Sequence, residues 1–163
     1  MSNGCGDCTM CCKVLGIDSG WLKKPANEWC SKCDKGKGCT VYDERPEDCR
    51  EFECLWLVLA KDPECETPSL SLRPDKSKVV LYPQEDGETV TAHVDPGNPT
   101  AWRKPEMMGM LKKMAANGLN VIVGSSTSKE RVLLKEHKGY VVAKTLAVVE
   151  EAKGRLTLKE KSK

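Results

Sequence analysis

Nine of the ten cysteines lie between Cys5 and Cys54, and this density constrains the fold more than any other feature of the chain. The first 54 residues contain only six Ile, Leu, Val or Phe side chains. Burying so few apolar groups cannot offset the entropy lost on ordering the backbone, so this segment needs another source of stability. Cysteines offer two such sources, which are disulfides and metal ions bound through thiolates.

The N-terminal residues indicate the compartment in which these cysteines work. The stretch MSNGCGDCTMCCK lacks the basic and apolar segments of a secretory signal. The longest apolar run, Leu55 to Ala60, is far too short to span a membrane. We therefore expect a cytoplasmic chain without a membrane partner, in which thiols stay reduced and bind metal. The alternative is a disulfide framework in an exported protein.

The distribution of charge argues against a nucleic-acid partner. Residues 1–65 carry 9 Lys and Arg against 12 Asp and Glu, and residues 66–163 carry 17 against 12. The formal net charge is +2, and the basic residues are not interleaved with aromatic residues. Neither half has the concentrated positive charge that is typical of a nucleic-acid-binding surface.

The first motif is a C-x2-C-x2-C-C run formed by Cys5, Cys8, Cys11 and Cys12. A C-x2-C spacing lets two thiolates converge on one ion from a tight turn. Adjacent side chains diverge in both helices and strands, so Cys11 and Cys12 cannot easily face the same ion. We expect them to serve two sites, or one of them to be structural.

A second C-x2-C pair, Cys30 and Cys33, follows an irregular linker over residues 14–29, and Cys39 comes after a glycine turn. The sequence Arg-Pro-Glu-Asp at residues 45–48 predicts a helix that runs toward Ala60. On one continuous helix Cys49 and Cys54 are about 140° apart, so they would face different sites unless the helix is broken between them.

These motifs resemble the YkgJ-type, or CxxCxxCC, family of zinc- or iron-chelating proteins. The likeness covers the first third of the chain and includes Tyr42, Arg45-Pro46, Arg50 and Phe52, which fall in order among the cysteines. A similar cysteine domain occurs in flagellin lysine N-methylases. The resemblance implies eight metal ligands, which are Cys5, Cys8, Cys11, Cys12, Cys30, Cys39, Cys49 and Cys54.

Two cysteines depart from this pattern. The resemblance leaves out Cys65, which we expect to be a free thiol, and Cys33. The C-x2-C partner Cys30 argues that Cys33 is a ligand, whereas the resemblance argues that it is not. On the resemblance, Cys33→Ser should retain the full metal content.

The identity of the metal depends on how the thiolates are spaced. Zinc takes four thiolates, so eight cysteines make two closed sites without an open position for catalysis. A [4Fe–4S] cluster also takes four, and Cys5, Cys8 and Cys11 have the spacing of bacterial ferredoxins. Zinc is preferred because Cys12 follows at once, where that motif has three intervening residues. The candidate cations that neutralise the site are Lys13, Lys32, Arg45 and Arg50.

The preferred functional hypothesis is a non-enzymatic metal-binding or accessory protein. Its partner is the metal ion or cluster itself, and an accessory role also allows for a protein partner. The alternative is an iron–sulfur redox component or a component of a protein-methylating enzyme. Neither His93 nor His137 has a neighbouring cysteine in sequence, and no catalytic motif accompanies them.

The second part of the chain has ordinary secondary-structure patterns. Strands are predicted over residues 78–82, 89–94, 119–123, 131–135 and 140–144, with a helix over 105–117 and a final helix over 145–163. The first two strands should form a hairpin. The expected fold class is α+β, in which a metal-stapled cysteine-rich module (residues 1–65) packs on a small β-hairpin, helix and β-sheet unit (residues 66–163).

Overall fold

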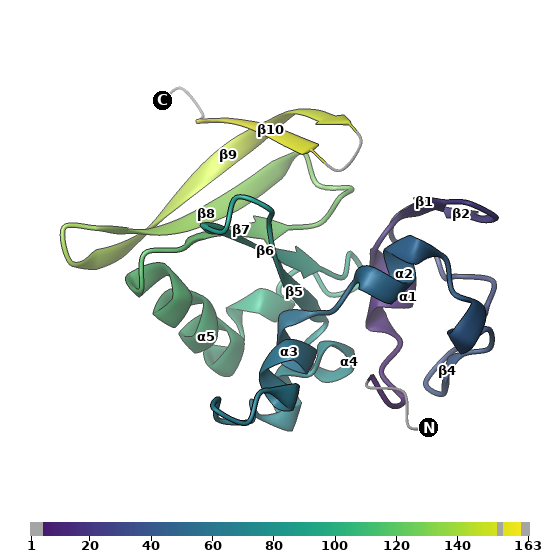
Figure 1. Ribbon diagram of the computed structural model, residues 1–163. Coiled ribbons are helices and arrows are strands. Elements are labelled where there is room, and N and C mark those ends of the chain that lie inside the picture. Colours follow the sequence, from purple (N-terminus) through teal and green to yellow (C-terminus); the bar gives the residue numbers. More distant parts are fainter. Residues whose placement is uncertain (1–4, 153–154, 161–163) are drawn as a thin grey trace. The chain divides into compact units, whose positions relative to one another are not determined.

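The computed structural model describes residues 5–152 and 155–160, which form a mixed fold of short helices and antiparallel and parallel strands (Figure 1). The predicted α+β class is confirmed. Contacts divide the chain into two compact units, Met1–Tyr82 and Pro83–Lys163, called unit 1 and unit 2 below. The boundary between the two units therefore lies within strand β5 (Val79–Pro83), whereas the composition of the sequence changes after Cys65.

Unit 1 is built from very short elements. The segment expected to be an irregular linker contains a hairpin, in which Ile17 lies opposite Lys24. Gly20 has a φ of 57° at its turn, a conformation that favours glycine. A second small hairpin places Cys33 opposite Cys39. In chain order the elements are α1 (Met10–Val14), β1 (Ile17–Ser19), β2 (Leu22–Lys24), β3 (Cys33–Asp34), β4 (Gly38–Cys39), α2 (Glu47–Glu51), α3 (Leu55–Lys61), α4 (Pro74–Ser77) and β5 (Val79–Pro83), with 3-10 turns at Tyr42–Glu44 and Leu70–Leu72.

The single helix predicted from residue 46 toward Ala60 is wrong, because the structure has two helices, α2 and α3, separated by a break. Phe52 and Cys54 have extended backbone, with ψ values of 121° and 152°. The break lets Phe52 pack against the buried residues Met10, Val14 and Val80. Its ring also meets Tyr82 edge-on, with centroids 5.7 Å apart. Tertiary packing of one aromatic ring therefore overrides the local helix pattern.

Unit 2 contains most of a twisted sheet. Among the described residues the sheet has six strands in the order β10-β9-β8-β7-β6-β5. Strands β6 and β7 are parallel and are joined through α5, while β8, β9 and β10 follow as antiparallel neighbours. The elements of unit 2 are β6 (Thr89–Val94), a 3-10 turn at Ala101–Arg103, α5 (Pro105–Ala116), β7 (Asn120–Gly124), β8 (Glu130–His137), β9 (Tyr140–Ala152) and β10 (Arg155–Glu160).

The predicted strands and the helix over residues 105–117 are confirmed in unit 2, and α5 buries Met107, Leu111 and Ala115. The spacing of these three residues is that of one helix face. Helix α5 packs on β7, β8 and β9. His93 is buried within β6, and His137 is at the end of β8.

The helix predicted over residues 145–163 is wrong, because β9 continues to Ala152 and β10 returns along it. Thr145 lies opposite Val132 and Ala147 opposite Glu130, so β8 pairs with the start of this segment, and β10 pairs with the rest of β9. The run also contains β-branched residues, which favour a pleated surface. Residues 153–154 and 161–163 of the predicted helix lie outside the described residues.

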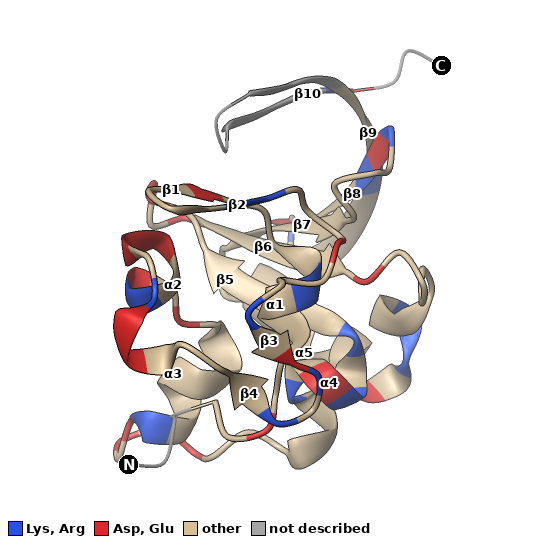
Figure 2. Ribbon diagram, turned by 90° about the vertical axis from the view of Figure 1, so that its right-hand side faces the viewer, with Lys and Arg blue, Asp and Glu red and all other residues tan. Residues whose placement is uncertain are grey.

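Charged groups are distributed unevenly over unit 1. Asp and Glu gather on α2 and on the turn before it (Figure 2). Within the described residues, no helix is both long enough and apolar enough to cross a bilayer.

Leu111 tests the core of unit 2, because its side chain is 0 % exposed. Leu111→Ala should lower the free energy of unfolding by about 2–5 kcal/mol, since it leaves a cavity between α5 and the sheet. The exposed neighbour Lys112 provides the matched control, and Lys112→Ala should change stability by less than about 0.5 kcal/mol. Urea unfolding followed by circular dichroism measures both. Equal stabilities of the two variants would contradict the packing.

Candidate functional site

All ten cysteines belong to the described residues and are free thiols. Cys30 is buried and Cys65 is exposed, while the other eight are half-buried. The short elements of unit 1 distribute them: Cys11 and Cys12 lie on α1, Cys33 on β3, Cys39 on β4, Cys49 on α2 and Cys54 at the N-cap of α3, with Cys5, Cys8, Cys30 and Cys65 in loops.

Cys12 is the centre of a larger group of thiols. It lies close enough to Cys11 and Cys33 to interact with both thiols; the interaction with Cys11, together with burial, raises the pKa of Cys12 strongly, and Cys33 opposes that shift. Burial and then the charge of Cys12 raise the pKa of Cys33 to about 12. Burial raises the pKa of Cys49 to about 11, with Cys12, Cys30 and Cys39 adding to the shift. We call Cys11, Cys12, Cys30, Cys33, Cys39 and Cys49 the six-thiol group.

A smaller group surrounds Cys54. Burial raises the pKa of Cys5, and the neighbouring Cys54 raises it further. Burial likewise raises the pKa of Cys8 to about 11, with a contribution from Cys54. Cys12 also acts on Cys5, so the two groups are within electrostatic reach of each other. We call Cys5, Cys8 and Cys54 the three-thiol group.

Lys24 places a buried cation beside the six-thiol group. Its ammonium group donates hydrogen bonds to the carbonyl oxygens of Lys13 at 3.3 Å and Pro25 at 3.0 Å, and to that of Leu15. Two of these carbonyls lie at the C-terminal end of α1, where a cation is favourable. Burial lowers the pKa of Lys24, and the charges of Cys30, Cys12, Cys11 and Cys49 oppose that shift.

Arg45 is the second cation of the site. The guanidinium group lies 3.7 Å from the centre of the Tyr42 ring and donates to the carbonyl oxygens of Tyr42 at 2.8 Å and Cys49 at 3.2 Å. Burial raises the pKa of Cys39 and Cys49, and Arg45 partly offsets that increase at both thiols. Fixed in this way, Arg45 favours the thiolate forms of its neighbours.

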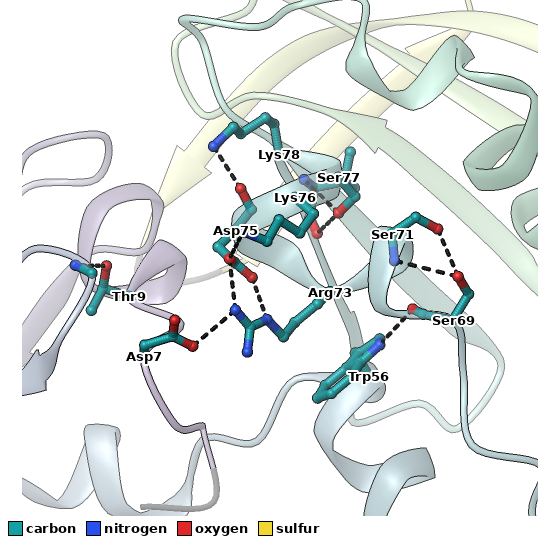
Figure 3. A network of polar contacts seen from close by, with 12 residues as sticks. Asp7, Thr9, Trp56, Ser69, Ser71, Arg73, Asp75, Lys76, Ser77 and Lys78 are labelled. Atoms are coloured by element: carbon teal, nitrogen blue, oxygen red, sulfur yellow. Dashed lines mark hydrogen bonds and ion pairs between the residues drawn. The ribbon is translucent and has the colours of Figure 1, made fainter.

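Residues beyond Cys65 complete the surroundings of the three-thiol group (Figure 3). The Arg73 guanidinium lies between two carboxylates, 2.8 Å from Asp7 and 2.6 Å from Asp75. Asp7 lies between Cys5 and Cys8 in sequence. Burial raises the pKa of Cys8, and backbone hydrogen bonds from Met10 and Asp75 partly offset it. The start of α4 therefore contributes directly to the environment of Cys8.

The remaining cations suggested by the sequence have other positions. Lys32 contributes its backbone N–H, which donates to the Sγ of Cys30 at 3.4 Å. The carbonyl of Lys13 receives the Lys24 ammonium group, and Arg50 lies in the last turn of α2. Of the four candidates, Arg45 is the one whose charge lowers the pKa of Cys5, Cys39 and Cys49.

The positions of the His, Cys, Asp and Glu side chains bear on metal coordination. Across residues 5–152 and 155–160, no group of three or more His, Cys, Asp or Glu side chains is arranged to hold a metal ion. The available donors are sulfur atoms, which suit zinc and iron–sulfur clusters. Comparison of the chain with protein-family models, with curated proteins and with solved structures finds no match.

Sequence reasoning missed Lys24 and Arg73. Lys24 lies on β2, where burial alternates along the strand: Leu22 and Lys24 are buried and Lys23 is exposed. A strand would place Leu22 and Lys24 on the same face, which was a usable signal. A lysine, however, is expected to face solvent until the hairpin shows that its position points inward. No local signal marks Arg73, because its partner Asp7 lies far away in sequence.

Lys24→Met tests whether this ammonium group holds the end of α1. The substitution leaves buried carbonyls without their donor and should lower the free energy of unfolding by about 1–3 kcal/mol. Lys23→Met is the matched control, because Lys23 forms an exposed ion pair with Asp18 and should change stability by less than about 1 kcal/mol. Chemical unfolding of both variants in the absence of added metal measures the difference. A smaller loss for Lys24→Met than for Lys23→Met would contradict this role.

Proposed function

We propose that this chain binds metal through the cysteine thiolates of unit 1, with zinc as the preferred ion and a [4Fe–4S] cluster as the alternative. The observation that carries the proposal is the convergence of the six-thiol group beside Lys24, a buried cation. Carbonyl oxygens satisfy the hydrogen bonds of this ammonium group, and neighbouring thiolates would in addition balance its charge. The candidate ligands are the eight cysteines implied by the resemblance to the CxxCxxCC family.

The charges beside the thiols support a thiolate site. Four thiolates around one divalent ion carry a net negative charge, which Lys24 and Arg45 are placed to offset. Rotation of a cysteine χ1 between staggered rotamers moves its sulfur without moving the backbone, and the proposed site requires such rotations. A zinc ion in such a site stabilises the fold and has no open coordination position for catalysis.

The [4Fe–4S] alternative draws on the hydrogen bonds to sulfur in the three-thiol group. Backbone hydrogen bonds from Met10 and Asp75 favour the thiolate of Cys8, and others from Leu57 and Trp56 favour that of Cys54. Such bonds set the reduction potential of an iron–sulfur cluster. Visible absorption of protein purified without oxygen separates the two metals, because a zinc protein is colourless and an iron–sulfur protein is brown.

Metal removal should unfold unit 1 selectively. The apolar cluster around α1 has three buried members among the described residues, Met10, Val14 and Val80, so bound metal should supply much of the folding free energy of unit 1. A strong chelator, or acid, should therefore abolish amide protection in unit 1 while β7 to β9 of unit 2 stay protected. The acid effect follows from the raised pKa of Cys8 and Cys49, about 11 each. Protons compete with metal for these thiols at any lower pH, so affinity falls as the pH falls.

Hydrogen exchange resolved by residue is the measurement for this prediction. Protection in unit 1 that is unchanged after complete removal of zinc and iron would contradict the proposal.

Cys39→Ser should lower the metal content, because serine at a ligand position leaves an incomplete thiolate shell. Cys65→Ser is the matched control, since Cys65 is exposed and lies outside both thiol groups. Its metal content should equal that of the unaltered protein. Zinc and iron are measured by elemental analysis of protein purified without oxygen. Equal metal content in the two variants would show that Cys39 is not a ligand.

A further inference from the structure

The turn from Cys30 to Cys33 is shaped around a sulfur atom. The backbone N–H of Lys32 donates to the Sγ of Cys30 at 3.4 Å, and the N–H of Cys33 donates to the carbonyl of Cys30 at 3.1 Å. A backbone N–H directed at sulfur stabilises the thiolate form and orients it. The turn therefore already presents Cys30 as a ligand, with Cys33 as the second cysteine of the same turn.

The hairpin of β3 and β4 brings a third cysteine to the same place. Cys33 lies opposite Cys39, and the neighbouring bond from the N–H of Thr40 to the carbonyl of Lys32 measures 2.8 Å. Bonded and non-bonded pairs alternate along an antiparallel ladder, so Cys33 and Cys39 form a non-hydrogen-bonded pair, with Cα atoms about 4.5 Å apart and side chains on one face. Two thiolates on a tetrahedral zinc ion lie about 3.8 Å apart, given a Zn–S length of about 2.3 Å. Rotation about χ1 can bring the two sulfur atoms of such a pair to that separation.

Cys12 joins the hairpin through its backbone and its side chain. The N–H of Cys30 donates to the carbonyl of Cys12 at 2.9 Å, and the thiols of Cys12 and Cys33 lie near enough to interact. Thr9 is buried just before α1, and its hydroxyl accepts a hydrogen bond from the N–H of Gly36 in the hairpin turn at 3.2 Å. These contacts hold the start of α1 against the hairpin.

We propose that Cys33 is a metal ligand and shares one four-thiolate site with Cys12, Cys30 and Cys39. The inference rests on the proposed function and departs from the resemblance, which implies Cys49 as a ligand and leaves Cys33 out. Cys49 is close to Cys12, Cys30 and Cys39, but a tetrahedral ion takes four ligands. The turn and the hairpin prearrange Cys33, so Cys49 is the thiol that lies beside this site.

Metal stoichiometry of matched serine variants tests the assignment. Zinc and iron are measured in the unaltered full chain, Cys33→Ser, Cys49→Ser and Cys65→Ser, all purified without oxygen. We expect Cys33→Ser to lose one metal equivalent and Cys65→Ser to keep it. Full metal content in Cys33→Ser, with a loss in Cys49→Ser, would overturn the inference while leaving the proposed function standing. Absence of metal from the unaltered protein would overturn both.

Cys33→His keeps the test decisive if Cys33→Ser does not fold, because histidine is also a zinc ligand. Cobalt(II) replaces zinc in both the unaltered protein and the variant, and its thiolate charge-transfer band reports the number of coordinated sulfurs. For this site we expect the band to fall by about one quarter, as four thiolates become three. Cys65→His is the control and should leave the band unchanged, because Cys65 is exposed and lies outside both thiol groups. An unchanged band in Cys33→His would contradict ligation by Cys33.

Discussion

The burial of the Lys24 ammonium group among thiols is the interaction on which the organisation of unit 1 depends. A charge removed from water must be compensated, and here carbonyl oxygens at the end of α1 and in the following chain provide hydrogen bonds. Cys11 and Cys12 lie on the same short helix, so fixing its end also fixes these thiols. The ammonium group is thus satisfied when the thiols are neutral and is stabilised further when they become thiolates.

The surroundings of the thiols are completed by residues that the composition assigns to a connecting segment. Arg73 joins Asp7 to Asp75 through a two-pronged contact, and the Trp56 indole donates to the carbonyl of Ser69 at 3.1 Å (Figure 3). Burial raises the pKa of Asp75, but Arg73 more than offsets it, so the net pKa lies below its usual range. The carboxylate therefore stays charged, and the loop of Cys5 and Cys8 is tied to the start of α4.

Backbone N–H groups directed at sulfur recur throughout the site. Cys30 receives one from its own turn, while Cys8 and Cys54 receive theirs from the starts of short helices or from α4. These donors favour thiolates without adding a charged side chain. These donors come from turns and helix ends, where backbone N–H groups have no helical partner. A chain built from such short elements has many N–H groups of this kind.

Much of the fold and the location of the candidate site followed from local patterns. Alternation and helical spacing predicted the strands and α5 of unit 2, because those elements bury one regular face each. Cysteine spacing marked unit 1 as a thiol-rich module. The final helix was predicted wrongly, since this segment pairs with β8 as far as Ala147 and with β10 beyond it, and these backbone partners decide its conformation.

The sequence by itself determined which residues are available for thiolate chemistry, because cysteine spacing and the scarcity of apolar residues are local properties. Only the tertiary structure decided their grouping. The break at Phe52 exists because the ring packs in the apolar cluster, and it separates Cys49 from Cys54. The register of β3 and β4 sets Cys33 opposite Cys39, and the β1–β2 hairpin turns Lys24 inward. The packing of Phe52 joins residues far apart in the chain, while the two hairpins join near neighbours whose pairing register is set by the turn geometry and not by residue type alone.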